Sequence, residues 1–183
     1  MVLLLGVGLA AVACARWTGP VADADAALAL GQWERALASY ARAEHRFDRL
    51  PVLREVIARD YNRVVTNQLW LYYRLQRYDD LIARAERAPE GATPHLWAGL
   101  ALLAKGRAET KPDAQLGWLT RSEEELRRAV EAEPADWDTK FDFELVTRLA
   151  AELRKQPKSP PSQLMQILRP PAKPGTKPGR RVG

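Results

Sequence analysis

Residues 31–43, GQWERALASYARA, decide the fold of this chain. Small and aromatic residues recur there at helical spacing, at Gly31, Trp33, Ala36, Tyr40 and Ala43. A glycine takes positive φ without cost, so it permits a tight turn directly before a helix. The alanines allow two helix backbones to approach closely, and the aromatic rings fill the space towards a neighbouring pair of helices. The stretch predicts the second helix of an antiparallel helical pair.

The same register recurs further along the chain. Gln76 and Gly117 each lie 12 residues before an alanine, matching the first copy. No period-2 strand pattern interrupts the series. Residues 107–116, RAETKPDAQL, are expected to be an insertion in which Pro112 breaks any helix. The first helix of the first pair is expected to be only a short alanine-rich stretch, residues 24–30. A helical pair cannot bury its apolar face alone, so about three pairs must stack.

This pattern resembles the tetratricopeptide repeat (TPR) family, whose second helix carries Gly, aromatic, Ala, aromatic and Ala at the same spacing. The resemblance implies an all-α fold, a TPR-like α-solenoid of about three helical hairpins closed by a C-terminal capping helix. The capping helix is expected in residues 137–155, WDTKFDFELVTRLAAELRK. The residues expected to cover the end of the stack are Trp137, Phe141, Val146 and Leu149. Those expected to face water are Asp138, Lys140, Glu144 and Arg148.

The chain divides into three parts. Residues 1–17 are a hydrophobic signal or anchor segment, residues 20–155 the helical repeat domain, and residues 156–183 a basic tail. The tail holds seven of the 13 prolines and no acidic residue, a composition typical of disorder. Residues 154–183 carry eight Lys or Arg, so the net charge of +5 leaves the first 153 residues at −3. The body offers no basic patch with interleaved aromatic residues, so nucleic-acid binding is not expected.

Within the tail, the sequence SQLMQILRP contains an apolar cluster. Its apolar residues, at a spacing that forms one helical edge, are Leu164, Met165, Ile167 and Leu168. A docking peptide, a contact with a membrane surface and simple solvation all fit this pattern.

Residues 2–15, VLLLGVGLAAVACA, contain no charged side chain, and this run of 14 residues is shorter than a bilayer-spanning helix. A secretory signal, a lipoprotein signal with lipidation at Cys14, and an uncleaved anchor all remain open. A buried first helix of the domain is disfavoured, because Gly6, Gly8 and the lack of a polar face make a poor amphipathic helix. We expect membrane attachment through this segment. Arg16 by itself favours a cytoplasmic body under the positive-inside rule.

The sequence offers little catalytic equipment. One cysteine excludes an intramolecular disulfide, and His45 and His95 each lack a second ligand at metal spacing. The clustered carboxylates Asp79–Asp80 and Glu123–Glu125 are interpreted as residues at helix starts, where negative charge meets the helix dipole. There is no phosphate loop and no nucleophile elbow. We expect neither an enzyme nor a bound metal or cofactor.

The richest aromatic cluster lies in LWLYYRLQRY, residues 69–78. Neighbouring residues of a helix point about 100° apart, so one face cannot bury all of these rings. Repeat packing is the plainer interpretation, but aromatic and arginine groups are also where binding energy concentrates. We therefore expect a groove for a peptide segment or helix of a protein partner. The residues expected to bind the partner are Asn62, Thr66, Asn67, Trp70, Tyr73, Arg74 and Arg77.

A narrower resemblance lies at the end of the repeats, in EAEPADWDTKFDFELVTRLAAEL. It is similar to the last repeat of small membrane-anchored TPR proteins that accompany MoxR-type ATPases and von Willebrand A-domain proteins in bacteria. The resemblance implies an adaptor or scaffold for assembly or maturation of such a partner, on the extracytoplasmic face of a bacterial membrane. The alternative function is a structural oligomerisation module whose basic tail touches anionic lipid.

Overall fold

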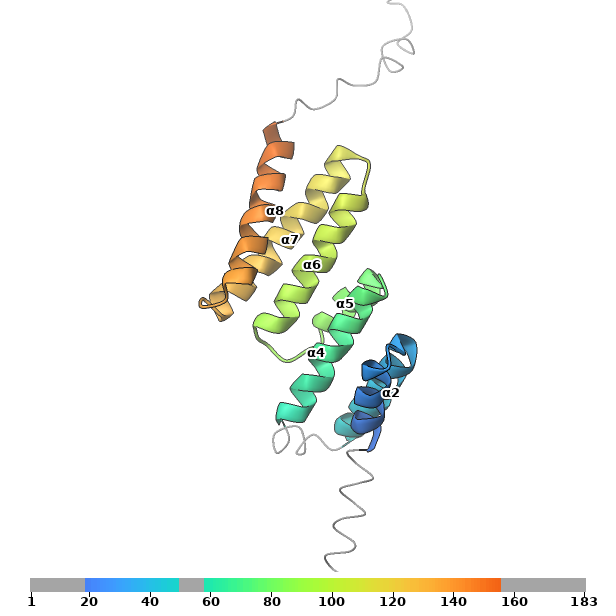
Figure 1. Ribbon diagram of the computed structural model, residues 1–183. Coiled ribbons are helices and arrows are strands. Elements are labelled where there is room, and N and C mark those ends of the chain that lie inside the picture. The colour runs from blue at the N-terminus through green and yellow to red at the C-terminus, as the bar shows by residue number, and fades with distance from the viewer. Residues whose placement is uncertain (1–18, 50–57, 156–183) are drawn as a thin grey trace, which may run out of the picture.

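The computed structural model describes residues 19–49 and 58–155, and within them the chain is helical with no strand. Residues 19–29 form the first helix. The other described helices are α2 (Trp33–Arg49), α4 (Ala58–Arg74), α5 (Tyr78–Ala85), α6 (Ala92–Ala108), α7 (Pro112–Ala132) and α8 (Trp137–Lys155). Helices adjacent in this order pack on one another, and α4 also contacts α6, which contacts α8. The all-α stack of helical pairs with a closing helix is confirmed (Figure 1).

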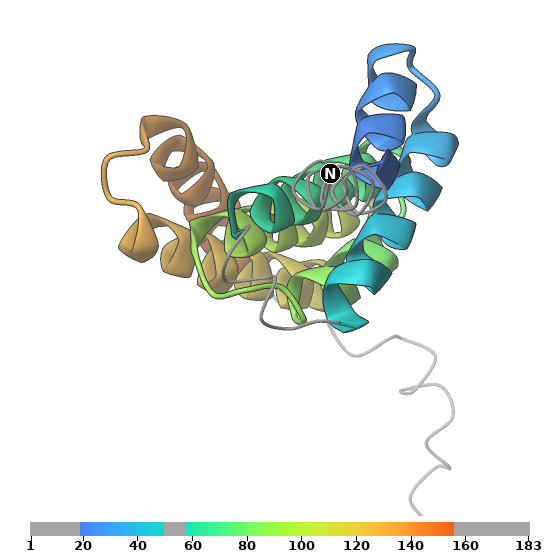
Figure 2. The ribbon, with the colours of Figure 1, turned by 90° about the horizontal axis from the view of Figure 1, so that it is seen from below.

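The stack is curved when it is viewed from below, roughly along the helix axes (Figure 2). In each pair the first helix neighbours the first helix of the next pair, so α4, α6 and α8 lie side by side and run in the same direction (Figure 1). Within the described ranges, no helix is both long and apolar enough to cross a bilayer. The predicted anchor and tail lie outside the described residues.

Two matching turns set the spacing of the first two pairs. Gly31 has φ 69° and Gln76 has φ 58°. At each turn the backbone N–H of this residue bonds to the carbonyl three residues back, and the next N–H bonds five residues back. These two hydrogen bonds define a Schellman motif, which ends a helix with one residue in the left-handed conformation. The register predicted from Gly31 and Gln76 is therefore confirmed.

The third copy of the register is different. Gly117 was expected at a turn, but it lies inside α7, where it is exposed. Pro112 breaks the helical path as predicted, but it does so by starting α7 at a position where its missing N–H costs nothing. Most of the expected insertion, residues 107–116, is therefore absorbed into longer α6 and α7. At the other end, the first helix reaches from residue 19 to 29 and is longer than its alanine-rich stretch suggested.

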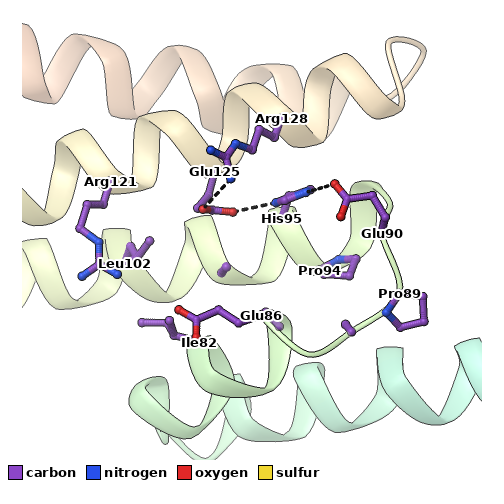
Figure 3. A pocket seen from close by; sticks show the side chains of 13 residues that line it. Ile82, Glu86, Pro89, Glu90, Pro94, His95, Leu102, Arg121, Glu125 and Arg128 are labelled. Atoms are coloured by element: carbon purple, nitrogen blue, oxygen red, sulfur yellow. Dashed lines mark hydrogen bonds and ion pairs between the residues drawn. The ribbon is translucent and has the colours of Figure 1, made fainter.

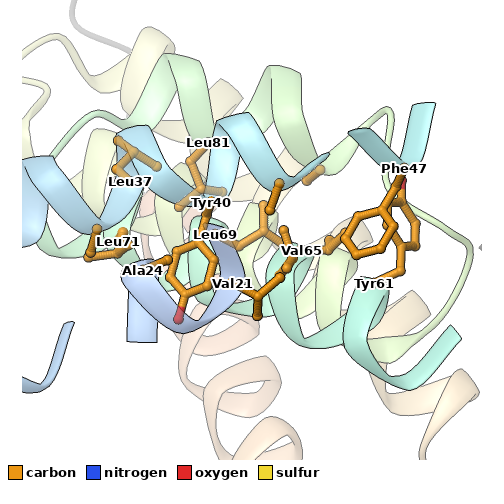
Figure 4. Close-up of a cluster of buried hydrophobic side chains, with 14 of the residues drawn as sticks. Val21, Ala24, Leu37, Tyr40, Phe47, Tyr61, Val65, Leu69, Leu71 and Leu81 are labelled. Atoms are coloured by element: carbon orange, nitrogen blue, oxygen red, sulfur yellow. The ribbon is translucent and has the colours of Figure 1, made fainter. Parts of the chain in front are cut away.

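One core cluster joins the first two pairs (Figure 4). Tyr40, Leu69 and Leu81 are fully buried in it, and Phe47 meets the ring of Tyr61 edge-on at 5.6 Å. The small residues predicted to allow close approach, such as Ala36 and Ala43, are buried here too. The side of α2 that was predicted to be buried, with Ala36, Tyr40 and Ala43, is therefore the side that packs in the core.

A second cluster joins α6, α7 and α8, and its buried residues are Leu103, Leu119, Leu126, Val146 and Ala150. Gly99 allows the closest approach, since a Cβ there would lie 2.6 Å from Cγ of Leu126. The Ser122 hydroxyl donates a 2.7 Å hydrogen bond to the Gly99 carbonyl across the same contact. Small residues on α6 therefore hold the third pair together.

The closing helix covers the stack with only part of its expected face. Val146 is buried and Leu149 packs on the second cluster, as predicted, but Trp137 and Phe141 are 75% and 68% exposed. The prediction was wrong for these two aromatic residues. Trp137 precedes Val146 by nine residues, which places it on the opposite side of a helix that turns about 100° per residue. Lys140 covers Trp137, with Nζ 4.4 Å from the ring centroid.

Candidate functional site

The surface formed by α4, α6 and α8 carries the candidate site, and we call it the inner face. The ring of Tyr73 on α4 lies 5.5 Å from that of Trp97 on α6. Burial raises the pKa of Tyr73, as do Tyr78 and the charge of Asp142 on α8, while Arg107 on α6 opposes the rise. Groups on all three helices therefore lie close enough to Tyr73 to affect its pKa. From the helical spacing around these residues, we assign to the inner face Thr66, Trp70, Tyr73, Trp97, Leu100, Ala104, Arg107, Asp138, Asp142, Leu145, Leu149 and Glu152.

The middle of the inner face is apolar. α6 buries Ala98, Ala101 and Leu102 on the side that packs in the stack. Trp97 lies one helical turn before Ala101 and packs against the same cluster, and both Trp97 and Leu100 are only partly buried. A surface helix normally presents polar residues on its outer side, whereas one apolar on all sides contacts other groups all round. The partly exposed surfaces of Trp97 and Leu100 therefore make this part of the inner face apolar.

One edge of the inner face is acidic. Burial raises the pKa of Asp142, and the nearby charges of Asp138 and Asp136 raise it further. Among the described residues, no lysine or arginine forms an ion pair with Asp138 or Asp142. Asp136 has a separate task, since it accepts hydrogen bonds from the Thr139 hydroxyl (2.6 Å) and the Asp138 N–H (2.9 Å) at the start of α8. Asp138 and Asp142 thus form an acidic edge on α8 that no described lysine or arginine neutralises through an ion pair.

The predicted binding residues of α4 divide between two sides. Asn62 and Thr66 line a pocket of about 160 Å³ with the chain at 89–94. Asn67 instead turns towards the first pair, where its Nδ2 donates a 2.6 Å hydrogen bond to the Tyr40 hydroxyl. That hydroxyl in turn donates to Asp25 at 2.5 Å. Asn67 therefore contributes to the packing of the first two pairs.

The other predicted residues lie towards the carboxyl end of α4. Trp70 packs edge-on against Trp33 at 5.4 Å, and Arg74 is exposed. Arg77 lies at the turn into α5, where it pairs with Asp80 at 2.7 Å and lies over the ring of Tyr72. The structure thus brings Tyr73 together with Trp97, and it places Asn67 and Arg77 elsewhere. Cys14, the predicted lipidation site, lies outside the described residues.

Sequence reasoning missed the contributions of α6 and α8 to this surface. Trp97 and Leu100 occupy one helical face, but their sequence HLWAGLALLAKG reads as a core helix. Asp138 was expected only to face water, and Asp142 was not singled out for binding. The continuous apolar character of α6 was the available signal, because a helix on an outer layer needs only one apolar side.

A cavity of about 300 Å³ lies on the other side of α6, between α5 and α7 (Figure 3). His95 lies on its wall, with Nδ1 2.7 Å from Oε2 of Glu125 and Nε2 3.2 Å from Oε1 of Glu90. Burial lowers the pKa of His95, but the hydrogen bonds to Glu125 and Glu90 outweigh it, so the pKa is raised. Arg128 lies 3.7 Å from Glu125. This cluster ties α6 to α7 and to the loop before α6.

The two carboxylate clusters lie at different positions in their helices. Asp79 and Asp80 lie in the first turn of α5, as predicted. Glu123–Glu125 lie in the middle of α7, so their predicted position at a helix start was wrong, because α7 begins earlier at Pro112. Their charges are balanced by arginines and His95 in place of a helix dipole. Among the described residues, no group of three potential ligands could hold a metal ion.

Comparison with known proteins supports the architecture. No protein-family model matches the chain, and no curated protein matches it. Among solved structures, it is similar to the NMR structure of the first TPR domain of the human RPAP3 protein. The TM-score is 0.52 at 15% sequence identity, and the match covers 78% of this chain and 98% of that one. The fold of this chain is therefore that of a TPR domain, an all-α solenoid of helical pairs.

Proposed function

We propose that the protein is a membrane-tethered adaptor without catalytic activity, which holds a segment of a partner protein on its inner face. The observation that carries this proposal is the combination of a partly exposed apolar strip on α6 with an unpaired acidic edge on α8. Such a surface suits a segment that has apolar side chains beside lysine or arginine. TPR domains bind protein partners in general, which agrees with this use of the fold.

The narrower proposal concerns the partner. The resemblance of residues 131–153 to the last repeat of TPR proteins found beside MoxR-type ATPases and A-domain proteins suggests one of these as the partner. Membrane attachment through residues 2–15, an extracytoplasmic body and a bacterial source belong to the same proposal. In this proposal, the protein acts in the assembly or maturation of a complex that contains the partner.

The test is capture of the partner by matched charge-reversal variants. The full-length chain is isolated from membranes after mild crosslinking, and the proteins bound to it are identified by mass spectrometry. Asp138→Lys with Asp142→Lys should abolish capture, because both changes place a cation where the ligand's cation would bind. Glu144→Lys is the control, since this exposed residue lies at least 120° around α8 from both Asp138 and Asp142.

The outcome of this pair of variants is decisive. Equal capture by both variants and the unchanged chain would show that the inner face does not bind the partner. Recovery of proteins other than a MoxR-type ATPase or an A-domain protein, still lost in the inner-face variant, would reject only the narrower proposal. Tyr73→Ala with Arg77→Ala is a weaker test, because Tyr73 also packs against Tyr78 and Trp97.

A structural oligomerisation module is the second candidate function. The exposed Trp137 and Phe141 on the outer side of α8 favour it, because exposed aromatic neighbours are typical of contact surfaces. Trp137→Ser with Phe141→Ser should then reduce the oligomer to a monomer in light scattering, and removal of residues 157–183 should abolish binding to anionic vesicles. If the unchanged chain is already a monomer in light scattering, the oligomerisation function is wrong.

A further inference from the structure

The inner face has a definite order along α8. From the carboxyl end of the helix, the residues on this side are Glu152, then the apolar Leu149 and Leu145, and then the acidic Asp142 and Asp138. With a rise of 1.5 Å per residue, Asp142 lies about 20 Å below the end of α8 at Lys155. Because α4, α6 and α8 run in the same direction, their carboxyl ends point towards the same end of the inner face (Figure 1).

The sequence that follows α8 has the complementary order. Seven residues, 156–162, are followed by the apolar group of SQLMQILRP and then by Arg169 and Lys173. Residues 154–183 contain no acidic side chain. A segment that turns back after Lys155 runs opposite to α8, so its apolar residues meet the apolar part first and its cations meet the acidic part second.

The connection is long enough for this path. Seven extended residues span at most about 23 Å, at roughly 3.3 Å per residue. Leu149 lies only about 9 Å below the end of α8, by the helical rise. The seven residues therefore reach the apolar part of the inner face with slack, and Arg169 reaches Asp142 without tension.

We propose that residues 163–169 of the chain itself dock on the inner face, antiparallel to α8. Leu164 and Ile167 lie on the strip formed by Trp97 and Leu100, and Arg169 pairs with Asp142. This inference rests on the proposed function, since it assigns an internal competitor to the same surface. A tethered segment has an effective concentration of the order of millimolar, so it blocks weak ligands and yields to tight ones.

Zero-length carbodiimide crosslinking of the full-length chain in detergent micelles tests the docking. The reagent joins a lysine amine to a carboxylate in direct contact, and peptide mass spectrometry identifies the linked pair. We expect Lys173 to be linked to Asp138 and Asp142 severalfold more than to Glu144, which points away from this side of α8. Leu164→Ser with Ile167→Ser should remove this excess, while the helical content of the body stays unchanged.

Mixing isotope-labelled and unlabelled chains separates links within one chain from links between two. Equal linkage to the inner and outer carboxylates, or links that form only between chains, would overturn the proposal. The capture experiment remains independent of this one. Loss of capture in the inner-face variant without any tail linkage would leave the adaptor function standing and reject the docking alone. Tail linkage without any inner-face dependence of capture would reject the adaptor function, and the tail would then be no competitor.

Discussion

Gln76 occupies a backbone conformation that suits glycine. Its φ of 58° lies in the left-handed region, and it ends α4 with the same two hydrogen bonds that Gly31 makes. A residue with a Cβ pays about 1 kcal/mol for this conformation. The two turns therefore differ in local strain although their hydrogen bonds are the same.

Gln76→Gly should raise the free energy of unfolding by about 1 kcal/mol, because the substitution relieves the left-handed strain. The matched change Gly31→Gln should lower it by a similar amount. Urea denaturation followed by circular dichroism measures both. A destabilised Gln76→Gly variant would mean that the side chain makes a contact worth more than the strain.

The pKa of His95 predicts how stability depends on pH. The folded pKa is raised above the ordinary value of about 6.5, so the folded chain binds the proton more tightly than the unfolded chain. The resulting stabilisation is fully present below the ordinary pKa and is lost as the pH rises through the raised pKa.

Denaturation of the full chain at pH 5.5 and pH 8 should show this as a difference from His95→Gln. We expect the unchanged chain to gain stability over the variant at the lower pH and to lose that gain at the higher pH. His45→Gln is the control, because His45 is exposed on α2. An identical pH dependence of the unchanged chain and His95→Gln would contradict the ion-pair assignment.

At the scale of the helices, two glycines have opposite roles. Gly99 lies where α6 meets α7, and an added Cβ would lie 2.6 Å from Cγ and 2.9 Å from Cδ2 of Leu126. Gly117 is exposed within α7, and an added Cβ there would point into open space, with no packing contact within 4 Å beyond its own helix backbone and chain neighbours.

Gly99→Ala should lower the free energy of unfolding by about 1–3 kcal/mol, since the helices must move apart. Gly117→Ala should raise it by about 0.5–1 kcal/mol, because alanine loses less entropy than glycine in a helix interior. Thermal unfolding of the two variants compares them directly. Equal and small effects would show that α6 and α7 adjust to the extra methyl group.

A buried polar network joins three helices of the first two pairs. Arg84 on α5 donates from Nε to Gln68 Oε1 at 2.8 Å, and its Nη2 lies 2.6 Å from Oε1 of Glu44. Gln68 Nε2 also donates to Glu44 at 3.0 Å. The Nη groups of Arg84 make no well-directed hydrogen bond within the described residues, although the ion-pair distance is short. Glu44 therefore compensates the charge of Arg84 mainly as a close counter-charge.

Glu44→Gln should destabilise the chain by about 3 kcal/mol, because it leaves the guanidinium of a buried arginine without a counter-charge. Glu44→Leu with Gln68→Leu and Arg84→Met should recover most of the loss, since three apolar side chains of similar size leave no buried polar group without a partner. Chemical denaturation of the single and triple variants compares them. A triple variant as unstable as the single one would place the loss in packing.

At the scale of the whole molecule, α8 is the lid of the second core cluster. Val146 and Ala150 are fully buried against Leu119 and Leu126. Full burial of one aliphatic side chain contributes about 1.5–3 kcal/mol. An open end of the stack would expose this surface to water.

A chain that ends after residue 136 should therefore unfold at a lower temperature and aggregate, because the α7 surface loses its cover. A chain that ends after Lys155 is the control and should change far less. Scanning calorimetry and light scattering distinguish the two. A stable, monomeric short chain would show that α8 is dispensable for the fold.

The sequence by itself determined the helical pairs, since the spacing of small and aromatic residues from Gly31 to Ala43 fixes which side of a helix packs. It also determined the turn at Gln76, because the register repeats there. The third pair could not be placed from this register, since Pro112 starts α7 early and carries Gly117 into the helix. Only the tertiary structure decided that Trp137 and Phe141 face outward and that Tyr73, Trp97 and Asp142 share one surface. The physical reason is that helix periodicity is local, whereas a surface shared by three helices depends on how those helices stack.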